Sequence, residues 1–119
     1  MHERKITHGD LKPENLVFEN RFKPGERPFV RLIDFGFAVD KTDDLYKKFG
    51  IKSTEFGTPL YMAPEKLRNE DLTELSDMWA VGIMAYYMLV GYPPFYSDNE
   101  TQLFNKIKTT DYRFFWEWD

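Results

Sequence analysis

The chain has 119 residues, 42% of them hydrophobic and 18% aromatic, which is enough apolar material for one folded domain and excludes a disordered tail. Its 16 basic and 20 acidic residues give a net charge of −4, so there is no electrostatic footprint for nucleic acid or an anionic membrane. The absence of cysteine excludes disulfides, thiolate zinc sites and cysteine nucleophiles. Because the N-terminus also lacks the apolar core of a secretory signal, we expect a cytoplasmic or nuclear location.

The first half of the chain is predicted to contain one β-hairpin followed by a polar segment. Apolar runs at Leu16–Phe18 and Val30–Ile33 flank NRFKPGERP, whose Pro-Gly pair and charges favour a long loop between two strands. After Asp34-Phe35-Gly36, the stretch 39–56 is charged. We expect that stretch to be a surface segment outside the core.

The most apolar stretch is MWAVGIMAYYMLVGY, residues 78–92, which carries no charge. Because a bilayer span needs about 20 apolar residues, we interpret it as a buried helix over about 76–91, which is apolar on all sides like a helix at the centre of a core. Ser76 is the expected N-cap, Asp77 the first-turn carboxylate, and Gly91 the end of the helix. Its large side chains are expected in the core: Trp79, Met84, Tyr87 and Met88.

Two other helices are predicted in the second half. A short helix over Pro64–Leu67 has proline in its first turn, where the missing N–H is not needed. An amphipathic helix is predicted over about 99–108, because Leu103, Phe104 and Ile107 recur at helical spacing.

Oxygen-bearing side chains lie at the two junctions between loop and strand. Asp10 and Asn15 precede the first strand of the hairpin, and Asp34 follows the second, so the hairpin folds them toward one another. Such oxygens suit Mg²⁺, which proteins commonly hold with one or two carboxylates plus substrate phosphates. Lys12 would place a positive charge on a transferring phosphoryl group. Taken singly, each residue also has an ordinary interpretation, as a turn former, a solvated charge or a cap.

The spacing of these residues resembles that of protein kinases. HGDLKPEN (8–15) resembles the kinase catalytic loop, H-R-D-L-x-x-x-N, while DFG (34–36) and APE (63–65) resemble the two ends of the kinase activation segment. Three longer blocks are similar to the same regions of calcium/calmodulin-dependent-type kinases: GTPLYMAPE (57–65), SDMWAVGIMAYYMLVGYPPF (76–95) and DNETQLFNKI (98–107).

The resemblance covers essentially the whole chain and implies its fold. Residues 1–119 are expected to form a partial protein kinase domain with an activation segment over 34–65. The implied fold class is α+β and mainly helical. It corresponds to a fragment of the large, C-terminal lobe that has a short β-hairpin and lacks the sheet of the N-terminal lobe.

The resemblance implies roles in transferring the γ-phosphate of ATP to protein Ser or Thr hydroxyls. Asp10 matches the catalytic base that accepts the hydroxyl proton, and Lys12 matches the lysine that steadies the γ-phosphate in serine/threonine kinases. Thr58 matches the threonine that helps hold Asp10 and Lys12. Asn15 and Asp34 match the metal ligands, so the implied cofactors are ATP and Mg²⁺.

Other positions match residues with structural roles in the family. His8 and Phe35 match members of the hydrophobic spine, and Gly36 completes the DFG motif. Asp77 matches the helix carboxylate that anchors the catalytic loop through its backbone amides. Glu65 matches a residue that normally pairs with an arginine far downstream, which this chain does not reach.

The resemblance also implies a class of substrate, a candidate partner and a mode of regulation. Glu14 matches a position at which some kinases contact an arginine of the peptide, so the expected partner is a basic protein substrate. Calmodulin is a candidate partner of the parent protein, and neither nucleic acid nor a membrane is expected. Gly9 stands where most kinases have an arginine that is neutralised by a phosphorylated activation segment; we therefore expect no such dependence. The candidate phosphorylation sites are Thr42, Ser53 and Thr54.

Two functional classes remain open. The chain contains no glycine-rich loop or V-A-I-K-type lysine, so by itself it is expected to have negligible activity. In the first class it is part of a working serine/threonine kinase, which the complete set of Asp10, Lys12, Asn15 and Asp34 favours. In the second it is a non-catalytic kinase-like interaction module or a remnant, which the start at Met1 favours.

Overall fold

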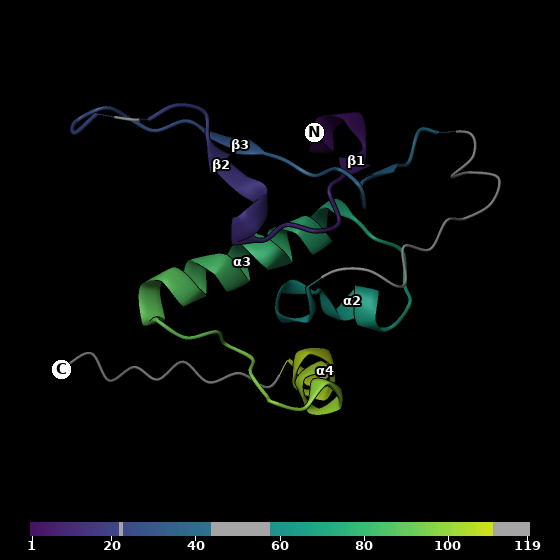
Figure 1. Ribbon diagram of the computed structural model, residues 1–119. Helices are drawn as coiled ribbons and strands as arrows, with labels where there is room; N and C mark the ends of the chain where they lie inside the picture. The colour runs from purple at the N-terminus through teal and green to yellow at the C-terminus, as the bar shows by residue number, and fades with distance from the viewer. Residues whose placement is uncertain (22, 44–57, 111–119) are drawn as a thin grey trace.

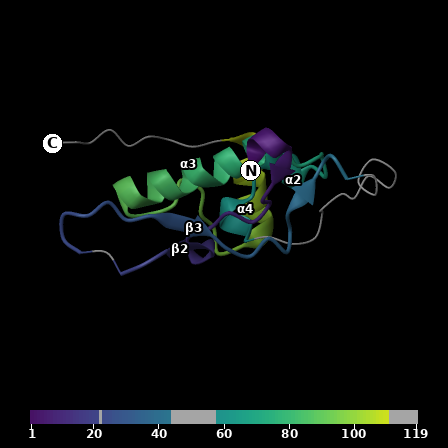
Figure 2. The same ribbon diagram turned by 90° about the horizontal axis from the view of Figure 1, so that it is seen from above.

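Helix α3 (Glu74–Val90) lies at the centre of the computed structural model, which describes residues 1–21, 23–43 and 58–110. The N-terminal strands lie on one side of α3, and helices α2 (Pro64–Leu67) and α4 (Glu100–Thr109) lie on the other (Figure 1). The turned view shows the loop of the hairpin pointing in the same direction as the C-terminal end of α3 (Figure 2).

Two small antiparallel sheets are present in the described part of the chain. The predicted hairpin is confirmed: β2 (Leu16–Phe18) pairs with β3 (Val30–Leu32), with Leu16 opposite Leu32. A second pair, β1 (Ile6–Thr7) with β4 (Val39–Asp40), was not expected from the sequence. Val39 is buried in it, so the prediction that the whole stretch 39–56 lies outside the core is wrong at its first residue.

Helix α3 begins two residues before the predicted start. Its N-cap is Thr73, whose hydroxyl accepts a hydrogen bond from the Leu75 N–H at 3.2 Å. Ser76, the predicted N-cap, occupies the third helical position instead, and its Oγ accepts from the Thr73 N–H at 3.1 Å to complete a capping box. Gly91 ends the helix as predicted, with a φ of 87°.

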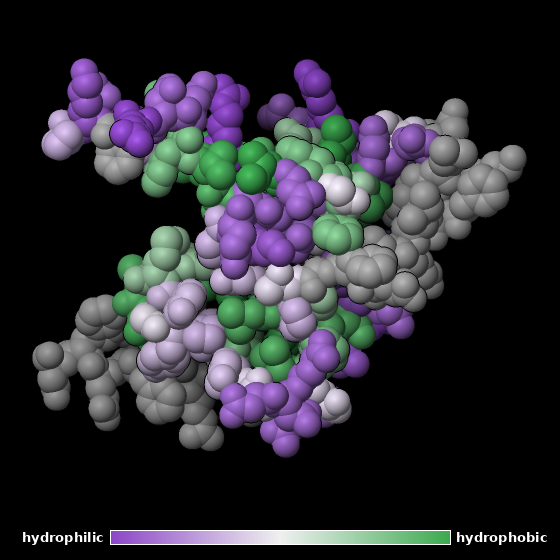
Figure 3. All heavy atoms as spheres, in the orientation of Figure 1, coloured by the Kyte–Doolittle hydropathy of each residue, from purple (hydrophilic) through white to green (hydrophobic). Residues whose placement is uncertain are grey.

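The prediction that α3 is a buried helix holds for only one of its faces in the described structure. The buried residues lie on one face of its first three turns: Ser76, Asp77, Ala80, Ile83 and Met84. Trp79 packs partly buried against the core, whereas Tyr87 is exposed and Met88 is 79% exposed. The described residues leave much of the C-terminal part of α3 uncovered, and apolar side chains lie on the visible surface of the molecule (Figure 3). No described helix is long and apolar enough to cross a bilayer.

The 3₁₀ turn η3 (Pro59–Tyr61) packs against both α3 and α4, and side chains of these three elements form much of the core. Helix α4 is the amphipathic helix that the sequence predicts, with Asn99 as N-cap accepting from the Gln102 N–H at 3.1 Å. Ile107 on its inner face is completely buried. Trp79 stacks on Phe95 with 5.7 Å between ring centroids. The buried apolar cluster comprises Leu11, Tyr61, Ala80, Ile83, Met84, Phe95, Leu103 and Ile107.

Candidate active site

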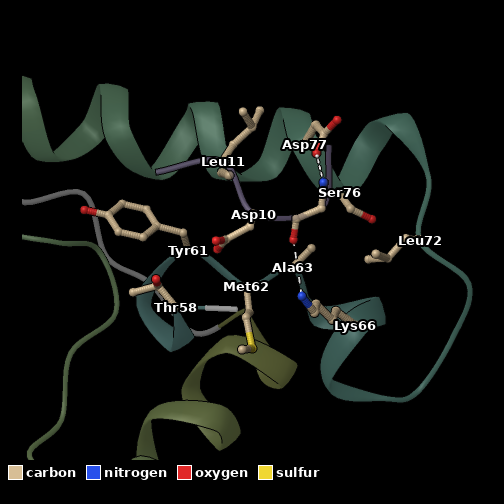
Figure 4. A pocket seen from close by; sticks show the side chains of 12 residues that line it. Asp10, Leu11, Thr58, Tyr61, Met62, Ala63, Lys66, Leu72, Ser76 and Asp77 are labelled. Atoms are coloured by element: carbon tan, nitrogen blue, oxygen red, sulfur yellow. Dashed lines mark hydrogen bonds between the residues drawn. The ribbon is translucent and has the colours of Figure 1, made fainter. Parts of the chain in front are cut away.

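The loop 8–15 is attached to α3 through Asp77, whose side chain is only 1% exposed. One carboxylate oxygen accepts the His8 N–H at 2.8 Å, and the other accepts the Gly9 N–H at 3.0 Å. His2 Nε2 lies 2.8 Å from the first oxygen. Figure 4 shows Asp77 reaching from α3 to the loop. A buried carboxylate is costly without such partners, so the contact holds loop and helix in one arrangement.

His8 connects the loop to the segment that follows the hairpin. It is fully buried, and its Nδ1 accepts a hydrogen bond from the Asp10 N–H at 3.2 Å. This implies that the other ring nitrogen, Nε2, carries the proton and donates to the Ile33 carbonyl at 3.0 Å. The His8 ring also contacts Phe35 edge-on, 4.9 Å between centroids, although Phe35 is about half exposed.

Four of the predicted site residues converge on one point. Lys12 Nζ lies 3.5 Å from Asp10 Oδ2 and donates to Thr58 Oγ1 at 3.0 Å. Asn15 Nδ2 donates to the Asp10 carbonyl at 2.8 Å and lies 3.4 Å from Asp10 Oδ2. The Asn15 amide nitrogen is therefore committed to Asp10, and its Oδ1 is the atom that a cation would contact.

Asp34 directly follows Ile33, whose backbone is hydrogen-bonded to that of Asn15. The Ile33 N–H donates to the Asn15 carbonyl at 3.0 Å, which brings the backbone on either side of the hairpin together. Asp34 is exposed, and its Oδ1 accepts the Gly36 N–H at 3.2 Å. Within residues 1–21, 23–43 and 58–110, no three His, Cys, Asp or Glu side chains form a metal cluster. One amide and one carboxylate fit Mg²⁺, which takes its other ligands from phosphates and water.

The remaining predicted residues have other partners or surroundings. Glu65 Oε1 accepts a hydrogen bond from Ser76 Oγ at 2.6 Å, which ties α2 to α3. Glu14 is exposed on the 3₁₀ turn η2 (Pro13–Asn15). Thr42 is exposed, and its hydroxyl donates to Asp40 at 2.6 Å. The other two candidate phosphorylation sites, Ser53 and Thr54, lie outside the described residues.

Two residues of the site are absent from the sequence prediction. One is His2, which contacts Asp77, and the other is Lys66, whose Nζ donates to the Gly9 carbonyl at 3.2 Å. Lys66 follows the APE motif and looks like an ordinary surface lysine in sequence, yet it is only 6% exposed. With Asp10 and Thr58 it lines a cavity of about 20 Å³ (Figure 4). That volume holds about one water molecule.

Adding a side chain at Gly9 is expected to lower the free energy of unfolding by about 2 kcal/mol. Gly9 has a φ of +80°, and a Cβ there would lie 2.7 Å from the Phe37 carbonyl oxygen. Gly25 is a matched control, since its φ is +92° but nothing lies within 4 Å of its Cβ position. Urea unfolding should show Gly9→Ala to be more destabilising than Gly25→Ala. Equal losses would show that the close approach to Phe37 is unimportant.

Lys66→Met is expected to change the pH dependence of stability. Burial lowers the pKa of the Lys66 ammonium below its usual 10.5, and the charge of Asp10 opposes this. Between the lowered value and 10.5 the unfolded chain binds more protons at this lysine, so its contribution to the free energy of unfolding rises with pH. Urea unfolding at increasing pH, up to 10.5, should show the wild type gaining stability relative to Lys66→Met. A constant difference would contradict the assignment.

Comparison with known proteins identifies relatives of the whole chain. A family model described as "Protein kinase domain" matches residues 1–117. The chain is 40% identical over 114 residues to a calcium/calmodulin-dependent protein kinase type 1 of Macrobrachium nipponense, and 39% identical to that of Caenorhabditis elegans. Each alignment covers 96% of this chain and 30% of the relative. The chain thus spans about a third of the length of these curated relatives.

Proposed function

The chain belongs to the protein kinase domain family, and we propose that it is part of the C-terminal lobe of a serine/threonine kinase. The parent enzyme would transfer the γ-phosphate of ATP to protein hydroxyls. The observation that carries this proposal is the convergence of Asp10, Lys12, Asn15 and Thr58 through contacts of 2.8–3.5 Å. Phosphoryl transfer depends mainly on positioning and charge, and these contacts supply both.

The proposed reaction gives each side chain one task. The acceptor hydroxyl oxygen forms a bond to the γ-phosphorus while the bond from that phosphorus to the leaving ADP oxygen breaks, and Asp10 takes the hydroxyl proton. Lys12, held between Asp10 and Thr58, places its positive charge beside the transferring group. Mg²⁺ bound by Asn15 and Asp34 would neutralise phosphate charge. Asn15 also holds the Asp10 backbone, which limits movement of the base.

Specificity and regulation follow from the same site. Lys12 and Thr58 support transfer to Ser or Thr, and the exposed Glu14 supports a basic peptide as substrate. Calmodulin is proposed as a partner of the parent protein because the relatives are named as calmodulin-dependent kinases. Gly9 has no side chain that a phosphate could contact, so we propose that activity does not require phosphorylation of Ser53 or Thr54.

The proposed function is tested most directly by transplantation. The 114 matching residues would replace the corresponding segment of the Caenorhabditis elegans relative, and the chimera would be assayed with Mg-ATP and a basic peptide carrying Ser, Tyr or Ala at the acceptor position. We expect transfer to the Ser peptide alone, and its loss when EDTA removes the metal. The 119-residue chain by itself should be almost inactive, because it contains no glycine-rich loop or strand lysine to hold ATP. A folded chimera without activity would overturn the proposal.

A further inference from the structure

Lys66 is a buried lysine in contact with the candidate catalytic loop. It lies on the single turn of α2, and its Nζ donates to the Gly9 carbonyl at 3.2 Å (Figure 4). A lysine loses side-chain entropy and hydration when it is buried, so such residues are rare unless a specific contact compensates. One contact of the Lys66 amino group is with the residue immediately before Asp10.

The peptide unit between Gly9 and Asp10 is held at both of its polar groups. Its carbonyl accepts from Lys66, and its N–H, which belongs to Asp10, donates to His8 Nδ1 at 3.2 Å. The preceding N–H, that of Gly9, donates to Asp77 at 3.0 Å. Rotation of the Gly9–Asp10 peptide therefore requires the loss of its bonds to Lys66 of α2 and to His8 within the loop, while the bond to Asp77 of α3 holds the preceding peptide.

Position 9 itself cannot supply this restraint. A Cβ at Gly9 would lie 2.7 Å from the Phe37 carbonyl oxygen and 3.4 Å from Leu72 Cδ1, so the backbone there is enclosed and has no side chain. The restraint comes instead from α2, through Lys66. The position of α2 is in turn fixed next to Lys66, because Glu65 accepts a hydrogen bond from Ser76 of α3 at 2.6 Å.

We propose that Lys66 is a positioning residue for the catalytic base: its amino group holds the Gly9 carbonyl and thereby orients the peptide that carries Asp10. The proposal rests on the proposed kinase function only in calling Asp10 a base. Lys66 touches neither the hydroxyl nor the phosphate in this scheme. Its loss should therefore lower kcat and leave the KM for ATP unchanged.

The contact is tested first in the 119-residue chain by NMR. Lys66→Met keeps a similar length and removes the donor, Lys66→Arg keeps donors, and Lys108→Met on the exposed side of α4 is the matched control. We expect Lys66→Met to shift the Gly9 carbonyl carbon and to speed hydrogen exchange at the Asp10 N–H roughly tenfold, the effect of one lost hydrogen bond. Lys108→Met should change neither.

The same spectra can also show that Lys66 does not hold the Gly9 carbonyl. A Gly9 carbonyl shift and an Asp10 exchange rate that are the same in Lys66→Met and Lys108→Met would remove the basis of the proposal. If Lys66→Met does not fold, the wild-type chain decides the question, because the Gly9 carbonyl shift must follow the titration of the Lys66 amino group. A Gly9 carbonyl chemical shift that stays constant while the Lys66 amino group titrates would also overturn the proposal.

The positioning role is tested in the chimera described above. Lys66→Met should lower kcat roughly tenfold with an unchanged KM for Mg-ATP, and Lys66→Arg should restore most of the rate. A shifted Gly9 carbonyl together with an unchanged kcat would mean that Lys66 is structural only and would overturn the proposal. An inactive wild-type chimera would refute the kinase function instead, and the NMR experiment would still decide whether Lys66 holds the peptide.

Discussion

Asp10→Asn is expected to lower the rate of phosphoryl transfer by the chimera about 10²–10⁴-fold, the usual cost of removing a general base. Asparagine has nearly the same shape, so the fold should survive the change. The bond from Asn15 to residue 10 goes to a backbone carbonyl and is kept, and the asparagine Oδ1 can still face Asn15 Nδ2. What is lost is the charged oxygen that attracts Lys12 and that takes the hydroxyl proton in the proposed reaction.

Asp71→Asn is the matched control, because it makes the same chemical change at an exposed position. It should leave the rate and the stability unchanged. Initial rates with saturating Mg-ATP and a basic serine peptide measure the effect, and circular dichroism checks the fold. An Asp10→Asn chimera that keeps the wild-type rate would show that Asp10 is not the base.

Asp77→Ala is expected to lower the free energy of unfolding by about 3–5 kcal/mol, because it leaves buried donors without their acceptor. The His8 and Gly9 N–H groups and the His2 ring all bond to this one carboxylate. Water cannot replace it easily, since the Asp77 side chain is almost completely buried. Asp77→Asn should cost less, because one carbonyl oxygen remains as an acceptor.

Glu74→Ala provides the control within the same helix. Glu74 lies in the first turn of α3 and is only partly buried, and its carboxylate interacts favourably with the N–H groups at the start of the helix. Urea unfolding followed by circular dichroism should separate the two variants by several-fold in free energy, with similar m-values. If Asp77→Ala were no more destabilising than Glu74→Ala, the attachment of the loop to α3 would be unimportant for the fold.

Local signals in the sequence predicted the α-helices and the β2–β3 hairpin of the described structure, but not the β1–β4 pair. The hairpin follows from two apolar runs around a Pro-Gly loop, and α2 and α4 follow from a first-turn proline and from helical spacing. These signals act over a few residues, so no tertiary information is needed to use them. The start of α3 was missed because Thr73 and Ser76 both look like caps, and only the capping box shows that Thr73 is the N-cap.

Burial was the property that the sequence predicted least well. Met88 and Tyr87 were assigned to the core because the segment is apolar all round, yet both are exposed in the described structure. Val39 was assigned to a polar surface segment, yet it is buried where β4 pairs with β1. Burial depends on which distant segment covers a side chain, and hydropathy along the chain does not contain that information.

The sequence by itself determined which chemical groups the site contains, because the types and spacing of Asp10, Lys12, Asn15 and Asp34 are written in the chain. Only the tertiary structure decided how they are held. His2 and Lys66 reach the loop from outside it, and Gly9 is enclosed by the carbonyl of Phe37. The physical reason is that a side chain's type is local, whereas its partners and its burial arise when segments far apart in the chain pack together.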